Sequence, residues 1–179
     1  MAEKIFPMFD NYIMFYHLDG YIALPVFPDS IQDSQSVGFK SSTPLARSAP
    51  IYSFSDAGPR SVQVSLKLHR DMMTQINAMN SSIPIAIGDD YIDTLVKEVQ
   101  AIALPEYGAG SKMVNPPIIA VRFGNDVYIK GVVSSQVTVT YNLPILDDGK
   151  YAVIDISFSV NEIEPTSAST VMSVGSYRS

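Results

Sequence analysis

The sequence predicts a mainly β protein of the α+β class, folded as an antiparallel barrel or sandwich with one or two flanking helices. Apolar and polar residues alternate in residues 61–69 and 151–163, which is typical of strands with one buried face. Glycine and proline residues separate the predicted strands, and helical spacing of apolar residues is confined to the middle of the chain. The 179 residues suit one domain, which we place at residues 1–164, followed by a tail at 165–179.

The first part of the chain predicts short strands separated by turns. The alternation is clearest in residues 61–69, where Val62, Val64, Leu66 and Leu68 occupy one face. The stretch from Asp56 to Pro59 combines turn-forming residues and predicts a break before that strand. The strands expected before it are residues 11–16, 20–27, 37–42 and 50–54.

Two helices are expected to follow, at residues 70–79 and 91–104. The second has the stronger apolar period, formed by Ile92, Leu95, Val96, Val99, Ile102 and Ala103. Asp89 or Asp90 can cap its start, and Pro105 should push Leu104 out of helical geometry. In the first helix Met72, Met73 and Met79 fit a core position, with a soft interaction surface as the alternative.

The last part returns to strands, predicted at residues 117–123, 127–141 and 151–163. In the last of these we expect a buried face made of Ala152, Ile154, Ile156, Phe158 and Val160. The connector at 142–149 is longer than a minimal hairpin turn, so it should project as a loop that Gly149 closes. The Ser- and Thr-rich segment 165–179 predicts a tail that is flexible or ordered by docking to a partner.

Composition excludes several functional classes. The chain has no cysteine, which excludes disulfides, cysteine nucleophiles and Cys-type zinc sites. Its net charge is −6 without a cluster of Lys or Arg, so stable nucleic-acid binding is not expected. The N-terminus lacks a signal-peptide pattern, and no apolar run approaches the ~20 residues that span a bilayer.

No constellation of reactive residues stands out, and the sequence predicts no catalytic, cofactor-binding or metal-binding residue. His17 and His69 lack the spacing of a metal site, and His69-Arg70-Asp71 lacks the other motifs of a kinase. The adjacent pairs Asp89-Asp90 and Asp147-Asp148 are explained as cap and turn residues. We therefore expect a protein that is not an enzyme and needs no cofactor.

An ordered set of residues in the last part resembles a known family. A strand ends in Phe123-Gly124, a second contains Gly131-Val132-Val133 and Ser135, and it continues to Tyr141. A loop then ends in Gly149, and a final strand ends at Glu162. This arrangement is similar to the tube-protein family of contractile injection systems and to the baseplate-adaptor proteins of contractile phage tails. A looser resemblance extends over residues 20–164.

The resemblance implies a barrel or sandwich of the tail-tube type, assembled as rings around a channel. It implies a structural subunit of a contractile phage tail, in the baseplate hub or at the hub–tube junction. DNA would pass through the channel without specific binding, and the partners would be other tube and baseplate proteins. The chain would be located in the virion tail, after assembly in the cytoplasm of a bacterial host. Phe123 replaces the family's usual Trp, which leaves the roles of tube subunit, tube initiator and adaptor open.

The sequence also yields expected contacts between subunits. We expect the 142–149 loop and the tail to contact neighbours in a sixfold ring of identical chains. The proposed contact residues are Asn142, Leu143, Pro144, Asp147, Asp148, Gly149, Val171, Met172 and Tyr177. The alternative is a receptor- or carbohydrate-binding β-sandwich module of the virion, which the ten tyrosines favour.

Overall fold

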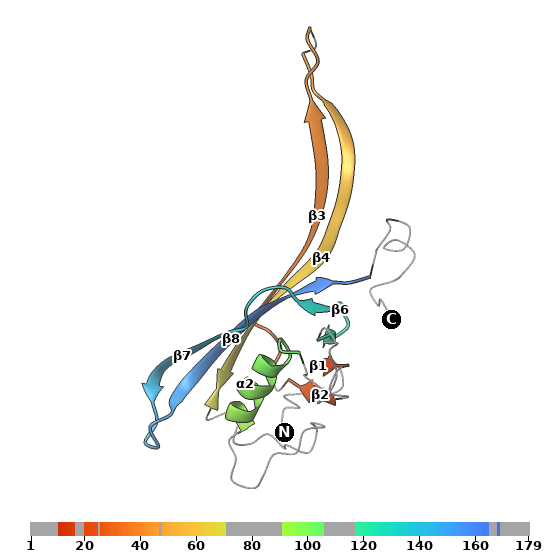
Figure 1. The fold of residues 1–179 in the computed structure, drawn as a ribbon. Helices are drawn as coiled ribbons and strands as arrows, with labels where there is room; N and C mark the ends of the chain where they lie inside the picture. The colour runs from red at the N-terminus through yellow and green to blue at the C-terminus, as the bar shows by residue number, and fades with distance from the viewer. Residues whose placement is uncertain are drawn as a thin grey trace.

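The part of the chain that the structure describes consists of strands with one helix packed against them (Figure 1). The computed structural model describes residues 11–16, 20–24, 26–46, 48–70, 91–105, 117–164 and 168. In chain order the elements are β1 (Asn11–Phe15), β2 (Gly20–Ala23), β3 (Ser30–Ser42), β4 (Ile51–His69), α2 (Tyr91–Ala101), β5 (Ile119–Phe123), β6 (Val127–Val133), β7 (Thr138–Ile145) and β8 (Tyr151–Glu162). The prediction of a mainly β protein with a helix is confirmed.

All eight described strands belong to one antiparallel sheet. Its order is β2-β1-β5-β6-β8-β4-β3, and β7 pairs with β8 outside this path. Among the described strands, β2 and β3 end the order and do not pair with each other, so the sheet is open. Of the two predicted alternatives, barrel or sandwich, the described strands do not form a closed barrel, and they broadly fit a sandwich-like α+β architecture.

Strand β8 organises the sheet because it has partners along both edges. One edge pairs with β4, from Ser61 opposite Asn161 to His69 opposite Val153. The other edge pairs first with β6 and then with β7, which lie end to end. The sequence predicted a single strand at 127–141, and this is wrong. Residues 134–137 interrupt it, although the Ser134 amide still donates a hydrogen bond to the Ser159 carbonyl at 2.9 Å.

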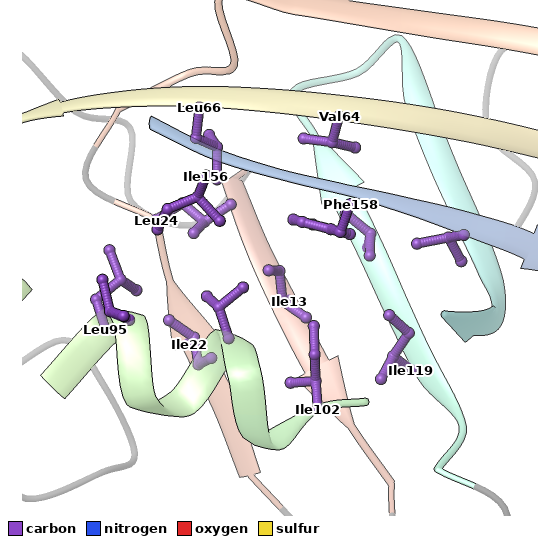
Figure 2. Packing of buried hydrophobic residues seen from close by; sticks show 14 of the residues in the cluster. Ile13, Ile22, Leu24, Val64, Leu66, Leu95, Ile102, Ile119, Ile156 and Phe158 are labelled. Carbon is purple, nitrogen blue, oxygen red and sulfur yellow. The ribbon is translucent and has the colours of Figure 1, made fainter. Parts of the chain in front are cut away.

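The hydrophobic core lies between α2 and the sheet (Figure 2). The predicted alternation in residues 61–69 and 151–163 is confirmed, since Val62, Leu66, Ile154 and Phe158 are all buried. The buried cluster comprises Ile13, Phe15, Ile22, Leu24, Val62, Val64, Leu66, Leu68, Ile92, Leu95, Val96, Val99, Ile102, Ile119, Val121, Phe123, Ile129, Ile154, Ile156, Phe158 and Val160. The core thus draws on β1, β2, β4, β5, β6, β8 and α2.

Helix α2 begins at Tyr91 and ends at Ala101, three residues earlier than predicted. Its apolar face is buried as its spacing predicted, and Leu104 is outside the helix, in line with the effect expected of Pro105. The Tyr91 hydroxyl donates a hydrogen bond to the Ala23 carbonyl at 2.8 Å, which fastens the start of α2 to the end of β2. Of the helix predicted at 70–79, only Arg70 is among the described residues. The three methionines of that helix lie outside them.

Strands β3 and β4 are much longer than the sequence predicted. They form a hairpin whose distal half extends far beyond the rest of the fold (Figure 1). The break expected from Asp56 to Pro59 is wrong, because β4 runs through it. The pairing shifts register between Gln35 and Val37, where Gly58 and Pro59 have no ladder partner. Pro59 is accommodated there because an irregular position does not require its missing amide hydrogen.

Candidate assembly surfaces

The β3–β4 hairpin continues the core-facing side of the sheet beyond the core. Near its base, Ile31 lies opposite Val64 and packs against the buried cluster. Beyond the base, odd-numbered residues of β3 stay on that same side, because β3 is regular and both register shifts place the extra residues in β4. Val37 therefore lies opposite Ala57, and Phe39 opposite Phe54, on the side that is buried lower down.

An ion pair marks the boundary between core and projection. The Arg60 guanidinium donates to both Asp33 carboxylate oxygens, with distances of 2.6–3.0 Å, and its Nη1 donates to the Tyr128 carbonyl at 3.0 Å. The hydrogen bond with Asp33 raises the pKa of Arg60. The pair fixes the base of the hairpin against β6, and residues beyond it leave the core.

The projecting part carries apolar side chains that no described residue covers. We define the arm surface as Val37, Phe39, Tyr52 and Phe54, whose exposed fractions lie between 53% and 65%. The Phe39 and Phe54 rings meet edge to face, with centroids 5.7 Å apart. Contiguous exposed aromatic groups are unusual on a monomer and are typical of interaction sites. A two-stranded hairpin is also only marginally stable alone, so this one is suited to a neighbour.

A second hairpin, β7–β8, projects from the other end of the sheet (Figure 1). We define the hairpin surface as Tyr141, Leu143, Ile145 and Tyr151, whose exposed fractions lie between 39% and 72%. The Tyr141 and Tyr151 rings are neighbours, with centroids 5.9 Å apart. The end of the hairpin is a turn at residues 146–149 that presents Asp147 and Asp148 to solvent.

The structure places the predicted contact residues of 142–149 on this second hairpin. Asn142, Leu143 and Pro144 continue β7 and do not form a loop, and the Asn142 amide donates to Asp155 at 2.7 Å. Gly149 closes the turn with φ +82°, as expected, and its amide donates to the Leu146 carbonyl at 2.9 Å. Their role in contacts between subunits stays a prediction. Val171, Met172 and Tyr177 lie outside the described residues.

The turn end of the second hairpin is fixed to the helix by charged groups, because Lys150 directly follows the turn at 146–149. Asp93 of α2 accepts from Lys150 Nζ at 2.9 Å and from Arg70 Nη2 at 3.1 Å. Burial alone would raise the pKa of Asp93, but the hydrogen bonds from Lys150 and Arg70 outweigh it and lower that pKa. Arg70 Nε also donates to the Tyr151 carbonyl at 3.1 Å. The hairpin is therefore held in place near its turn, while the side chains of the hairpin surface remain exposed.

Four of the ten tyrosines gather on the outer face of β1, β2 and β6. Tyr12 and Tyr128 flank Arg122 in register, Tyr21 lies opposite Met14, and Tyr16 follows β1 on the same side. Burial raises the pKa of Tyr128 to about 12, with the neighbouring Tyr16 adding to the shift. Lys130 Nζ lies 5.4 Å from the centre of the Tyr16 ring. This face combines aromatic rings with cations.

Two open hollows lie on the surface, and polar and apolar residues line both. One, of about 350 Å³, lies at the base of the arm beside Arg60, Glu162 and Glu164. The other, of about 400 Å³, lies beside the interruption between β6 and β7 and is lined by Gln63, Gln136 and several Ser and Thr residues. Neither hollow brings a nucleophile together with a base.

The described ranges hold no group of three His, Asp or Glu side chains placed to bind a metal ion. His69 is exposed at the end of β4, and His17, Asp71, Asp89 and Asp90 lie outside the described residues. Within the part of the chain that the structure describes, no helix is long and apolar enough to cross a bilayer.

Comparison with known proteins adds no identification. No protein-family model matches the chain, and no curated protein matches it. The sequence reasoning found the β7–β8 hairpin but missed the arm. The signal for the arm was present, because Val37 and Phe39 alternate with polar residues as Tyr52 and Phe54 do.

Proposed function

We propose that the chain is a structural, non-enzymatic subunit of a contractile phage tail, with a fold of the tail-tube type. Its place would be the baseplate hub or the hub–tube junction, as tube initiator or adaptor. The observation that carries the proposal is the pair of projecting hairpins, each with uncovered apolar side chains. Such surfaces are suited to a protein that functions within an assembly.

Three further observations support this function. The ordered motifs from Phe123 to Glu162 resemble those of tube and adaptor proteins. Among the described strands, β2 and β3 each have an outer edge without a partner strand, which a neighbouring subunit can cover. A net charge of −6 suits a channel wall along which DNA slides without being held. In this role the chain forms a ring, with six copies as the expected number.

The test is a stop codon at Glu3 in the phage genome that carries this reading frame. Electron microscopy of the lysate should show filled heads without complete contractile tails, and a plasmid copy of the gene should restore them. Complete tails with normal infectivity would overturn the proposal. Mass spectrometry of complemented particles should find the chain in the tail fraction, and its absence there would also count against the proposal.

A second function is favoured by the tyrosine face of β1, β2 and β6. Aromatic rings with adjacent Arg122 and Lys130 can bind sugar rings, so the chain could instead be a receptor- or carbohydrate-binding module of the virion. In that case the stop-codon phage would assemble complete tails that fail to adsorb. Tyr21→Ala would then reduce adsorption, whereas it should leave tail assembly and adsorption unchanged if the chain is a hub subunit.

A further inference from the structure

We propose that copies of this chain associate head to tail, with the arm surface of one copy docking on the hairpin surface of the next. The occupant of each surface is thus a second copy of the chain. The inference rests on the proposed function for its biological role and specifies which parts of two subunits meet. The defining residues are Val37, Phe39, Tyr52 and Phe54 on one side and Tyr141, Leu143, Ile145 and Tyr151 on the other.

Charge complementarity identifies the partner surface. Residues 37–57, which span the arm surface, include Lys40, Arg47 and Asp56, whereas residues 141–151, which span the hairpin surface, include Asp147, Asp148 and Lys150. The first stretch therefore has a net charge of +1 and the second a net charge of −1, and the Lys150 ammonium is already paired with Asp93. Lys40 and both aspartates are exposed, so they remain available to a neighbour. Docking of arm on arm would bring like cations together, and docking of hairpin on hairpin would bring four carboxylates together. Of the three pairings, only the mixed contact joins stretches of opposite net charge.

The fold prevents the two surfaces of one copy from meeting each other. The arm and the β7–β8 hairpin leave the sheet in different directions, and the β4–β8 ladder separates their bases (Figure 1). Arg60 fixes the base of the arm, and Asp93 fixes the turn end of the β7–β8 hairpin. The mixed contact must therefore form between copies, and a heterologous contact of this kind generates a closed ring or a filament.

The strand edges at both surfaces are compatible with this contact. In the described part of the sheet, β3 is an end strand and β7 pairs with β8 alone. The outer edges of β3 and β7 therefore have backbone groups available to an incoming strand. Side-chain docking would bring one such edge from each copy close together, which adds directional hydrogen bonds to an apolar contact.

Chemical cross-linking can test the contact directly because the chain has no cysteine of its own. One preparation carries Phe39→Cys and another carries Leu143→Cys, both at exposed positions. A short bismaleimide should cross-link the mixture into dimers and leave each preparation alone as monomers. The matched control replaces Leu143→Cys by Lys97→Cys on the exposed side of α2, and that mixture should give no dimers.

Reversing the charges on the two surfaces tests the same contact while the cysteine positions stay fixed. Lys40→Glu in the Phe39→Cys chain should reduce dimer yield roughly tenfold, and Asp147→Lys with Asp148→Lys in the Leu143→Cys chain should restore it. Circular dichroism of each variant checks that the fold is retained. Cross-links in Phe39→Cys alone would show arm-to-arm docking and overturn the inference. The inference would also be overturned if folded mixtures gave no cross-links, or if the charge reversal left the dimer yield unchanged.

The two proposals fail in distinguishable ways. Mixed cross-links together with normal tails in the stop-codon phage would leave the head-to-tail contact standing and remove its assignment to a phage tail. Missing tails together with absent cross-links would retain the tail role and overturn the contact.

Discussion

Glu98 is a carboxyl group in an unfavourable place on α2. Its Oε1 is buried and has no hydrogen-bond partner in the described part of the chain. Burial raises the pKa of Glu98 to about 7 from its ordinary value of 4.5, because the charged form is poorly solvated there. The folded chain therefore holds this proton more tightly than the unfolded chain does.

This arrangement predicts a pH-dependent stability. Between pH 4.5 and 7 the folded state binds the proton that the unfolded state has released, so stability falls as the pH rises through that window. Below it the contribution is fully present. Glu98→Gln removes the titration, so the difference in urea midpoint between wild type and variant should change across the window and be constant above pH 8. A constant difference from pH 4 to 8 would contradict this account.

Gly131 is required where β6 meets β8. A Cβ at this position would lie 1.9 Å from the Asn161 carbonyl oxygen, which is backbone and cannot turn aside. Gly131→Ala should therefore cost about 2–3 kcal/mol by forcing the two strands apart. Gly149→Ala meets no atom and should cost only about 1 kcal/mol, from its left-handed backbone. Equal urea midpoints for the two variants would show that β6 and β8 separate readily.

At the scale of elements, the sequence correctly predicted those strands that have one face buried along their whole length. Strands β1 and β8 begin and end close to where the pattern placed them, because their buried positions alternate with exposed or half-buried ones. Elements that depend on distant pairing were mispredicted. Pro59 suggests a turn locally, but β4 continues through it because β3 supplies a partner on the far side.

The β8 alternation gives a matched pair of variants. Phe158 is buried in the core, whereas the neighbouring Ser157 points to the opposite face of the strand. Phe158→Ala should reduce the free energy of unfolding by about 3–5 kcal/mol, because it leaves a cavity between α2 and the sheet. Ser157→Ala should cost less than about 1 kcal/mol. Urea titration measures both, and similar losses would mean that the strand register is wrong.

At the scale of the whole molecule, less of the architecture could be predicted from the sequence. Alternation specifies that a strand has a covered face, but it does not specify whether the cover comes from the same chain or from a neighbour. Val37 and Phe39 carry the same pattern as Val62 and Val64, yet the first pair is exposed and the second is buried. Whether a sheet closes is also decided by whether its end strands meet, and here β2 and β3 do not. The candidate surface at 142–149 was predictable because an exposed turn is a local feature.

The proposed head-to-tail contact predicts that the arm contributes to assembly and little to the stability of one copy. None of the described residues within 37–57 belongs to the buried core, while Arg60 and Asp33 hold the base of the arm without them. Replacing residues 37–57 by Asn-Gly, which favours a tight hairpin turn, should leave the thermal midpoint of the isolated chain within a few degrees of wild type. Sedimentation velocity should show that the shortened chain stays monomeric at concentrations where the full chain forms oligomers. The matched control shortens the other hairpin's turn by deleting Asp147 and Asp148, which should weaken assembly without abolishing it, because the apolar hairpin surface remains. A shortened chain that unfolds would show that the arm stabilises the monomer's own fold. A shortened chain that assembles as the full chain does would show that the arm takes no part in the contact.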